Sequence, residues 1–200
     1  MLTRDYHRLV SQQTRLVTQV KGALKEDYPR PVEVFGDLTA KVALDFLQAY
    51  PTPQALSGVT PQQWEAFAQA HSLSQVRTQQ LWEALSQPQF AIPEHVVRAK
   101  SRLVGGLVEQ LEVVGGAVVT SRKEVEGAFA SLPASELTQT LPGGKSGTTI
   151  PTLWAELGDA EGRWESFQHL QAQAGTVPVP KQRGKSHLVQ FRVACNKQLR

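Results

Sequence analysis

The sequence contains few of the residues that would cross-link a chain, hold a metal ion or cross a membrane. Its single cysteine, Cys195, excludes an internal disulfide, and the five scattered histidines leave no spacing typical of a metal site. No run approaches the roughly 18 uncharged apolar residues of a membrane span, and the opening MLTRDYHRLVSQQ is too polar for a signal peptide. We therefore expect a soluble, cytoplasmic protein in which Cys195 is a small apolar filler.

The sequence does contain enough apolar residues for a folded core. Of its 200 residues, 40% are hydrophobic, which suits one ordinary domain or two small ones. The net charge is only +3, yet residues 181–200 hold six Lys/Arg and no Asp/Glu. Such a run is either a solvated tail or a folded basic surface. The apolar residues within HLVQF and RVACNKQL favour the folded surface, which would suit a polyanionic partner.

Two long periodic segments predict two long helices. In residues 1–27, apolar residues recur at alternating steps of four and three, and Gln13 interrupts this seam once. The seam consists of Leu2, Tyr6, Leu9, Leu16 and Val20. Residues 93–131 carry a second stripe, which consists of Leu103, Leu107, Leu111, Val114, Val118 and Val125. We expect this stripe to pack on the first helix in antiparallel fashion, or on another copy of the chain.

Glycine pairs at 105–106 and 115–116 interrupt the second long segment. Each glycine costs a helix about 1 kcal/mol relative to alanine. Close crossing of another helix would explain the pairs, and so would relaxed selection on the sequence.

Shorter helices are expected between the two long ones. Asp37 or Thr39 can cap a helix over 40–50, Thr60 opens a capping box with proline at the first helical position, and Ser72 or Ser74 can cap a helix over 75–87. The apolar residues of these helices lie at helical spacing, which is most typical of a core. They are Trp64, Phe67, Leu81, Trp82 and Leu85.

The last third changes character after SLPASE, residues 131–136. It predicts a short helix, an LPGGKSG turn, helices over 149–157 and 164–174 ended by Gly158 and Gly175, a strand pair around Val177 and 188–191, and a final helix. We predict two domains, 1–132 and 133–200. The fold class is mostly α: an antiparallel coiled-coil or helical region, followed by a small helical domain with a helix-hairpin-helix-like turn and a short strand pair.

The stretch TLPGGKSGTTIP, residues 140–151, looks at first like a nucleotide-binding loop. Such a loop needs a glycine five residues before its Gly-Lys pair, where this sequence has Gln139, and it should follow a buried strand. Two interpretations stay open: a turn that only packs two helices, or one whose Gly143, Gly144 and Lys145 contact a nucleic-acid phosphate.

Four pieces of the sequence, in order, resemble one known family. LPG, ELGD, AGTVPVP and the basic ending RVACNKQLR are similar to the C-terminal domain of transposases of the insertion-sequence 110/116/902 family. The upstream QQTRLVTQVKGALKEDYP and FGDLTAKVALDFLQAYPTPQAL resemble that family's helical middle region. The resemblance therefore covers almost the whole chain.

The resemblance implies an RNA-guided DNA recombinase. In the family, an N-terminal RuvC-like domain supplies carboxylates for a divalent metal, a coiled coil mediates assembly, and the C-terminal domain supplies a nucleophilic serine. This chain begins after the carboxylate domain, so we expect no cofactor in it. Arg183 stands where the family serine is expected, and arginine cannot be a nucleophile. Ser186 is the alternative, but it needs a positioned base such as Lys185 or His187.

Three functions remain open at this point. The first is a truncated, transposase-derived protein that binds DNA, and in one version a structured guide RNA, and forms a homo-oligomer through its long helices. The second is an active recombinase that works with a separate carboxylate domain. The third is an oligomeric helical relic without nucleic-acid affinity. In the first, phosphates would be neutralised by Lys145, Lys181, Arg183, Lys185, Arg192, Lys197 and Arg200.

Overall fold

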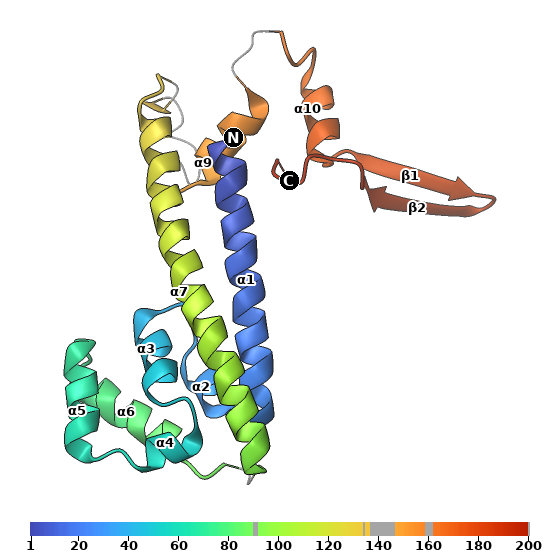
Figure 1. The fold of residues 1–200 in the computed structure, drawn as a ribbon. Coiled ribbons are helices and arrows are strands. Elements are labelled where there is room, and N and C mark those ends of the chain that lie inside the picture. Colours follow the sequence, from blue (N-terminus) through green and yellow to red (C-terminus); the bar gives the residue numbers. More distant parts are fainter. Residues whose placement is uncertain (90–91, 134, 137–146, 159–161, 200) are drawn as a thin grey trace. The chain divides into compact units, whose positions relative to one another are not determined.

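The structure is a computed structural model that describes residues 1–89, 92–133, 135–136, 147–158 and 162–199. Within these residues the chain forms nine helices and ends in an antiparallel two-stranded hairpin, which confirms the mostly α fold with a strand pair (Figure 1). The long helices are α1 (Leu2–Asp27) and α7 (Glu94–Ala130), as the periodic segments predict. The short helices of the first part are α2 (Arg30–Val34), α3 (Lys41–Ala49), α4 (Pro53–Ser57), α5 (Pro61–Ala70) and α6 (Gln75–Leu85).

The chain divides into two compact units. Unit 2 is Arg8–Val119, and unit 1 combines Met1–His7 with Thr120–Arg200. Unit 1 contains α9 (Thr149–Leu157), α10 (Phe167–Ala174), β1 (Pro178–Arg183) and β2 (Ser186–Phe191). The domain division at 132/133 stays a prediction.

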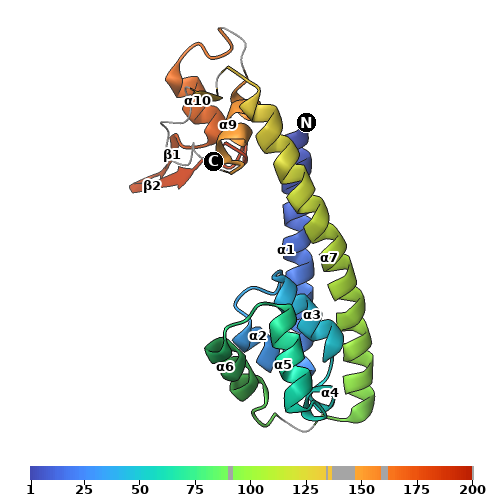
Figure 2. The ribbon, with the colours of Figure 1, turned by 90° about the vertical axis from the view of Figure 1, so that its left-hand side faces the viewer.

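Within unit 2, α1 and α7 lie side by side in antiparallel fashion, and α2–α6 gather around the C-terminal end of α1 (Figures 1 and 2). Leu16, Val20 and Leu24 of α1 share one buried core with apolar residues of α7, namely Val104, Leu107, Val108, Leu111 and Val114. Lys100 Nζ lies 2.5 Å from Glu26 Oε2. The stripe of α7 therefore packs on the first helix in this unit. A coiled coil with another copy of the chain stays a prediction.

The predicted apolar stripe of α7 is wrong at one residue. Leu103 is 49% exposed, and Val104 is buried in its place. The reason is that the predicted stripe takes two successive steps of four between Leu103 and Leu111, which places Leu103 about 80° from Leu111 around the helix, whereas Val104 lies about 20° from it. Close helix crossing does not explain the glycines either, because a Cβ added at Gly105, Gly106 or Gly116 would meet nothing within 4 Å.

α7 is also the one helix among the described residues that is long and apolar enough to cross a membrane, with a mean hydropathy of 1.4 over its most apolar window. This is weak evidence, because core helices of soluble proteins share these properties.

The short helices of unit 2 begin largely as the sequence predicts. Thr60 and Gln63 form the capping box of α5, and Ser74 rather than Ser72 caps α6. The predicted cap at Asp37 or Thr39 is wrong: α3 begins at Lys41 after Ala40, which has no side-chain cap bond. Asp37 instead accepts hydrogen bonds from the backbone N–H and the hydroxyl of Thr39. The two side chains thus form a local turn with each other and do not cap α3. The predicted aromatic core is confirmed, with Trp64, Leu81 and Leu85 buried.

The predicted ends of the two helices in the last third of the chain are confirmed. Gly158 and Gly175 terminate α9 and α10 with positive φ values of 73° and 72°. α10 begins at Phe167, later than predicted, because the Ser166 side chain accepts from His169 N. The predicted LPGGKSG turn lies outside the described residues except for Gly147, and so does most of the short helix before it.

The predicted final helix is wrong. Residues 192–199 form bends and turns. Asn196 N donates to Gln173 O of α10, and the Asn196 side chain accepts from Gln198 N. These bonds take the backbone groups that a helix would pair within itself.

Candidate nucleic-acid interface

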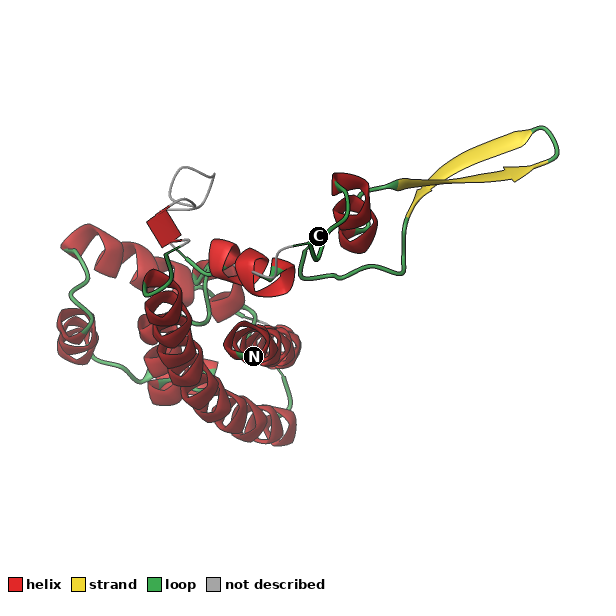
Figure 3. Cartoon of the chain, turned by 90° about the horizontal axis from the view of Figure 1, so that it is seen from above, coloured by secondary structure: helices red, strands yellow, loops and turns green. Residues whose placement is uncertain are grey.

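The C-terminal hairpin is specified by its turn and its prolines. β1 and β2 form an antiparallel hairpin, drawn as the two yellow strands (Figure 3). Arg183 lies opposite Ser186, and Gly184 and Lys185 form the loop. Gly184 has φ 59°, as a type II′ hairpin turn requires at its first loop position. In a two-residue hairpin the pair that flanks the loop is hydrogen-bonded and the pairs then alternate, so Pro178 and Pro180 fall in non-hydrogen-bonded pairs. Their missing N–H groups would point away from β2, which is why prolines are tolerated here.

Successive side chains of a strand point to opposite faces, so the register divides the hairpin into two faces of different chemistry. We call one the basic face; it consists of Val179, Lys181, Arg183, Ser186, Leu188 and Gln190. We call the other the apolar face; it consists of Pro178, Pro180, Gln182, His187, Val189 and Phe191. All of these residues except the half-buried Val179 are exposed. Both faces therefore meet solvent within the described chain.

The structure brings three of the predicted phosphate-binding residues together. Lys181 and Arg183 lie on the basic face of β1, and Lys185 lies in the adjoining turn. Arg192 follows β2 and its Nε donates to Ala194 O at 3.2 Å, while Lys197 is exposed in the turn beyond. The remaining predicted residues lie outside the described part of the chain: Gly143, Gly144, Lys145 and Arg200.

Ser186, the alternative nucleophile, flanks the turn on the basic face opposite Arg183. His187 is the next residue and therefore lies on the other face of the hairpin. Within the described residues no hydrogen bond is found between the Ser186 hydroxyl and a base. A catalytic role for Ser186 stays a prediction.

A buried carboxylate ties the segment after the hairpin to the rest of unit 1. Glu156 of α9 is 5% exposed and receives three side-chain hydrogen bonds. Arg4 donates Nε to Oε1 at 2.8 Å and Nη2 to Oε2 at 2.9 Å, and Asn196 donates Nδ2 to Oε2 at 2.7 Å. One turn earlier on α9, the Thr152 hydroxyl lies 3.0 Å from His7 Nε2. The hydrogen bonds from Arg4 are the main cause that lowers the pKa of Glu156 to about 2.

Sequence reasoning missed Arg4, Glu156 and Asn196 as a group. Two signals were available: Glu156 and Asn196 lie in the motifs ELGD and RVACNKQLR that carry the resemblance, and Thr152 and Glu156 are polar residues four apart on α9. Neither signal shows that the three residues meet, because Arg4 is 152 positions from Glu156 and Asn196 is 40 positions away.

The junction between α10 and the hairpin is equally constrained. Gly175 N donates to Ala172 O and Thr176 N to Gln171 O, the two bonds of a Schellman motif with glycine in the left-handed conformation. A Cβ added to Gly175 would lie 2.6 Å from the Cβ of Cys195. Cys195 thus packs directly on the glycine, in keeping with its predicted role as a small filler.

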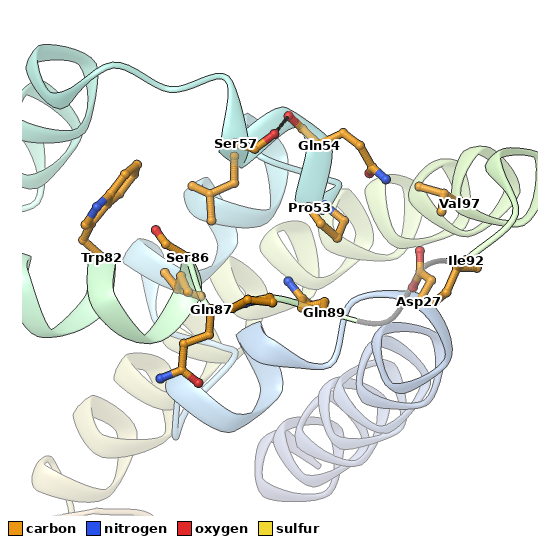
Figure 4. A pocket seen from close by; sticks show the side chains of 13 residues that line it. Asp27, Pro53, Gln54, Ser57, Trp82, Ser86, Gln87, Gln89, Ile92 and Val97 are labelled. Carbon is orange, nitrogen blue, oxygen red and sulfur yellow. Dashed lines mark hydrogen bonds between the residues drawn. The ribbon is translucent and has the colours of Figure 1, made fainter.

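A separate pocket lies in unit 2, between Asp27, the loop before α7, α4 and the end of α6 (Figure 4). Its volume is about 440 Å³. Asp27 is the last residue of α1 and is 3% exposed, and burial is the main cause that raises the pKa of its carboxyl. Asp27 Oδ1 and Gln89 Oε1 have no hydrogen-bond partner among the described residues. The lining of the pocket therefore includes two buried acceptor atoms whose hydrogen bonds are not made within the described residues.

No group of three His, Cys, Asp or Glu side chains among the described residues could hold a metal ion.

Comparison with known proteins supports the resemblance seen in the sequence. Residues 135–200 match the family described as "Transposase IS116/IS110/IS902 family". Over 207 aligned residues the chain is 26% identical to the "Mini-circle putative transposase for IS117" of Streptomyces coelicolor. This alignment covers 100% of the chain but 50% of that relative, so the chain spans about half the length of the curated protein it matches. No solved structure matches the chain.

Proposed function

We propose that this chain, whose residues 135–200 belong to the IS116/IS110/IS902 transposase family, acts in DNA transposition as a nucleic-acid-binding protein. The observation that carries the proposal is the charge of the hairpin segment. Residues 166–199 contain no Asp or Glu, and within them Lys181, Arg183 and Lys185 are exposed on one short hairpin. Closely spaced cations without a neighbouring acid suit the regular negative charge of a polynucleotide backbone.

We further propose that the described residues bind DNA without cutting it. Arg183 stands where the resemblance expects a serine, and its guanidinium can pair with a phosphate through two parallel hydrogen bonds but cannot attack one. The chemistry of this position therefore supports binding.

The test is fluorescence anisotropy of the chain with a labelled DNA duplex and with a structured RNA, repeated over a salt series. Affinity should fall linearly in log salt, and the variant Lys181→Ala/Arg183→Ala/Lys185→Ala should weaken binding and lower the slope by about 0.9 for each of its cations that contacts a phosphate. The matched control Arg77→Ala/Arg98→Ala/Arg102→Ala removes three exposed cations from unit 2. Equal losses in both variants, or no binding at low salt by a folded sample, would contradict the proposal.

Assembly of copies through the long helices is a second part of the proposal. Its support is that three apolar residues of the long helix α7, Leu103, Val113 and Val119, are 49%, 74% and 54% exposed. They point in different directions around the helix, so each would meet another helix as a separate contact. Sedimentation equilibrium should show a mass above 22.0 kDa, and a monomer at all concentrations would contradict this part.

A further inference from the structure

The hairpin is too small to be stable by itself. A two-stranded hairpin without a covering layer is marginal in water, because it buries little apolar surface. Here every strand residue except Val179 is exposed within the described chain, and Leu188 and Val189 are 52% and 55% exposed. A hairpin of this kind gains order when a partner covers one of its faces.

The outer edge of β1 is a poor place for that partner. Pro178, Pro180 and Gln182 fall in non-hydrogen-bonded pairs, so two of the three β1 positions whose N–H groups would point outward carry no N–H, and Gln182 is the exception. Proline on a strand edge blocks the addition of another strand. A partner that contacts β1 therefore has the two faces of the hairpin available to it, and not the outer edge of the strand.

The two faces differ in what they can recognise. The basic face carries the hairpin's strand cations, Lys181 and Arg183, together with the hydrogen-bonding Gln190. Arginine pairs with the N7 and O6 atoms of guanine, glutamine pairs with the N6 and N7 atoms of adenine, and apolar side chains contact the thymine methyl group. The apolar face has prolines, valine and phenylalanine along most of its length, and Gln182 and His187 lie only at its tip.

The dimensions of the hairpin also match one kind of nucleic acid. Its strands lie about 4.8 Å apart and are about 20 Å long for six residues each. The major groove of B-form DNA is about 12 Å wide and admits a two-stranded ribbon, whereas the major groove of A-form RNA is too deep and narrow for side chains to read.

We propose that the basic face of the β1–β2 hairpin enters the major groove of B-form duplex DNA, with Lys181, Arg183 and Gln190 toward the base edges. This inference rests on the proposed function and adds to it the form of nucleic acid, the groove and the face. Lys185 has a different role: it lies in the turn, where it contacts the phosphate backbone whatever the sequence.

The experiment compares four ligands with matched sequence and nearly the same backbone charge by anisotropy at one salt concentration, and repeats the plain duplex over a salt series. The first is a plain duplex with a central A·T run, and the second is that duplex with glucosylated 5-hydroxymethylcytosine, which fills the major groove. The third is the plain duplex with distamycin in its minor groove, and the fourth is double-stranded RNA. Wild-type affinity should fall roughly tenfold or more for the second and fourth ligands. It should change less than about twofold for the third, because the minor groove makes no contact in this arrangement.

Two pairs of hairpin variants separate the roles of its residues. Arg183→Ala should shrink the difference between plain and glucosylated DNA, because it removes a base contact. Lys185→Ala removes the same charge at the tip, and should weaken binding to all four ligands alike and lower the salt slope by about 0.9. Gln182→Ala and His187→Ala lie on the apolar face and should leave the preference unchanged.

The outcomes keep the two proposals apart. Equal affinity for plain and glucosylated DNA overturns the groove assignment and leaves nucleic-acid binding in place. The preference for plain over glucosylated DNA could instead be lost in Gln182→Ala or His187→Ala and kept in Arg183→Ala. In that case the apolar face enters the groove, and the inference is overturned. Absence of binding to plain DNA at low salt overturns the proposed function and this inference together.

Discussion

Arg4 and Glu156 lie 152 positions apart and form an ion pair with two parallel hydrogen bonds, at 2.8 and 2.9 Å. The glutamate side chain is 4% exposed, whereas the arginine side chain is 65% exposed. The cation therefore stays largely hydrated while it neutralises a buried anion. Asn196 fills the remaining site on Glu156 Oε2, so one carboxylate joins the start of α1, α9 and the segment that follows the hairpin.

This pair predicts an acid-sensitive unit 1. The pKa of Glu156 is lowered from 4.5 to about 2, mainly by Arg4. Because the folded pKa is below the unfolded one, the stabilisation is fully present above pH 4.5 and is lost as the pH falls toward 2. We expect a loss on the order of 2 kcal/mol in the free energy of unfolding across this window. Urea unfolding at pH 6, 4, 3 and 2.5 measures it.

The variant Glu156→Gln is the control for this window, because other acids of the chain also titrate there. It keeps the shape of the side chain and removes its charge, so its stability should fall less steeply between pH 4.5 and 2. Identical pH profiles for the variant and the wild type would show that the Arg4–Glu156 pair does not stabilise the fold.

Asn196→Ala should destabilise unit 1 by about 1–3 kcal/mol, since it removes a donor to a buried carboxylate. It also removes the acceptor for Gln198 N. Gln198→Ala is the matched control, because its side chain is exposed and its backbone N–H is unchanged. Thermal unfolding followed by tryptophan fluorescence measures both variants. Equal melting temperatures for the two would contradict the role assigned to Asn196.

Gly175→Ala should destabilise unit 1 more than Gly162→Ala does. Both glycines have positive φ, 72° and 76°, so each substitution costs about 1–2 kcal/mol of backbone strain. Only at Gly175 would the new Cβ also lie within 2.6 Å of Cys195 and 3.1 Å of Arg192 O, whereas Gly162 has nothing within 4 Å. The difference between the two free energies of unfolding isolates the contact with Cys195, and no difference would argue against it.

Gly106→Ala should stabilise α7 by up to about 1 kcal/mol, because alanine has the higher helix propensity and nothing lies within 4 Å of the added Cβ. Gly115→Ala is the comparison, since its Cβ would meet Gln13 Nε2 at an ordinary 3.5 Å. Denaturant unfolding followed by circular dichroism gives the change. A destabilised Gly106→Ala protein, or one with a smaller mass in solution, would show instead that another copy of the chain covers this glycine.

Local sequence signals predicted much of the fold correctly. The bounds of α1 and α7 followed from apolar periodicity, and the start of α5 followed from the Thr60 capping box. The ends of α9 and α10 followed from Gly158 and Gly175. In each case the decisive interaction lies within a few residues of the chain, which is why the sequence alone could show it.

The errors at the start of α3 and after the hairpin arose where a side chain had more than one possible hydrogen-bond partner. Asp37 closes a turn with Thr39 instead of capping α3, and Asn196 bonds to α9 and α10 in place of continuing a helix. Both side chains compete with the backbone for hydrogen bonds, and tertiary neighbours decide the outcome.

For the candidate site, the sequence by itself determined its charge. The run of cations without acids is a local feature, so the amino-acid sequence is enough to identify Lys181, Arg183 and Lys185. Only the tertiary structure decided that Lys181 and Arg183 share one face, since strand register sets which side chains lie together. It alone decided that Glu156 is held by Arg4 and Asn196, because the free energy of a buried charge depends on groups that folding brings from distant parts of the chain.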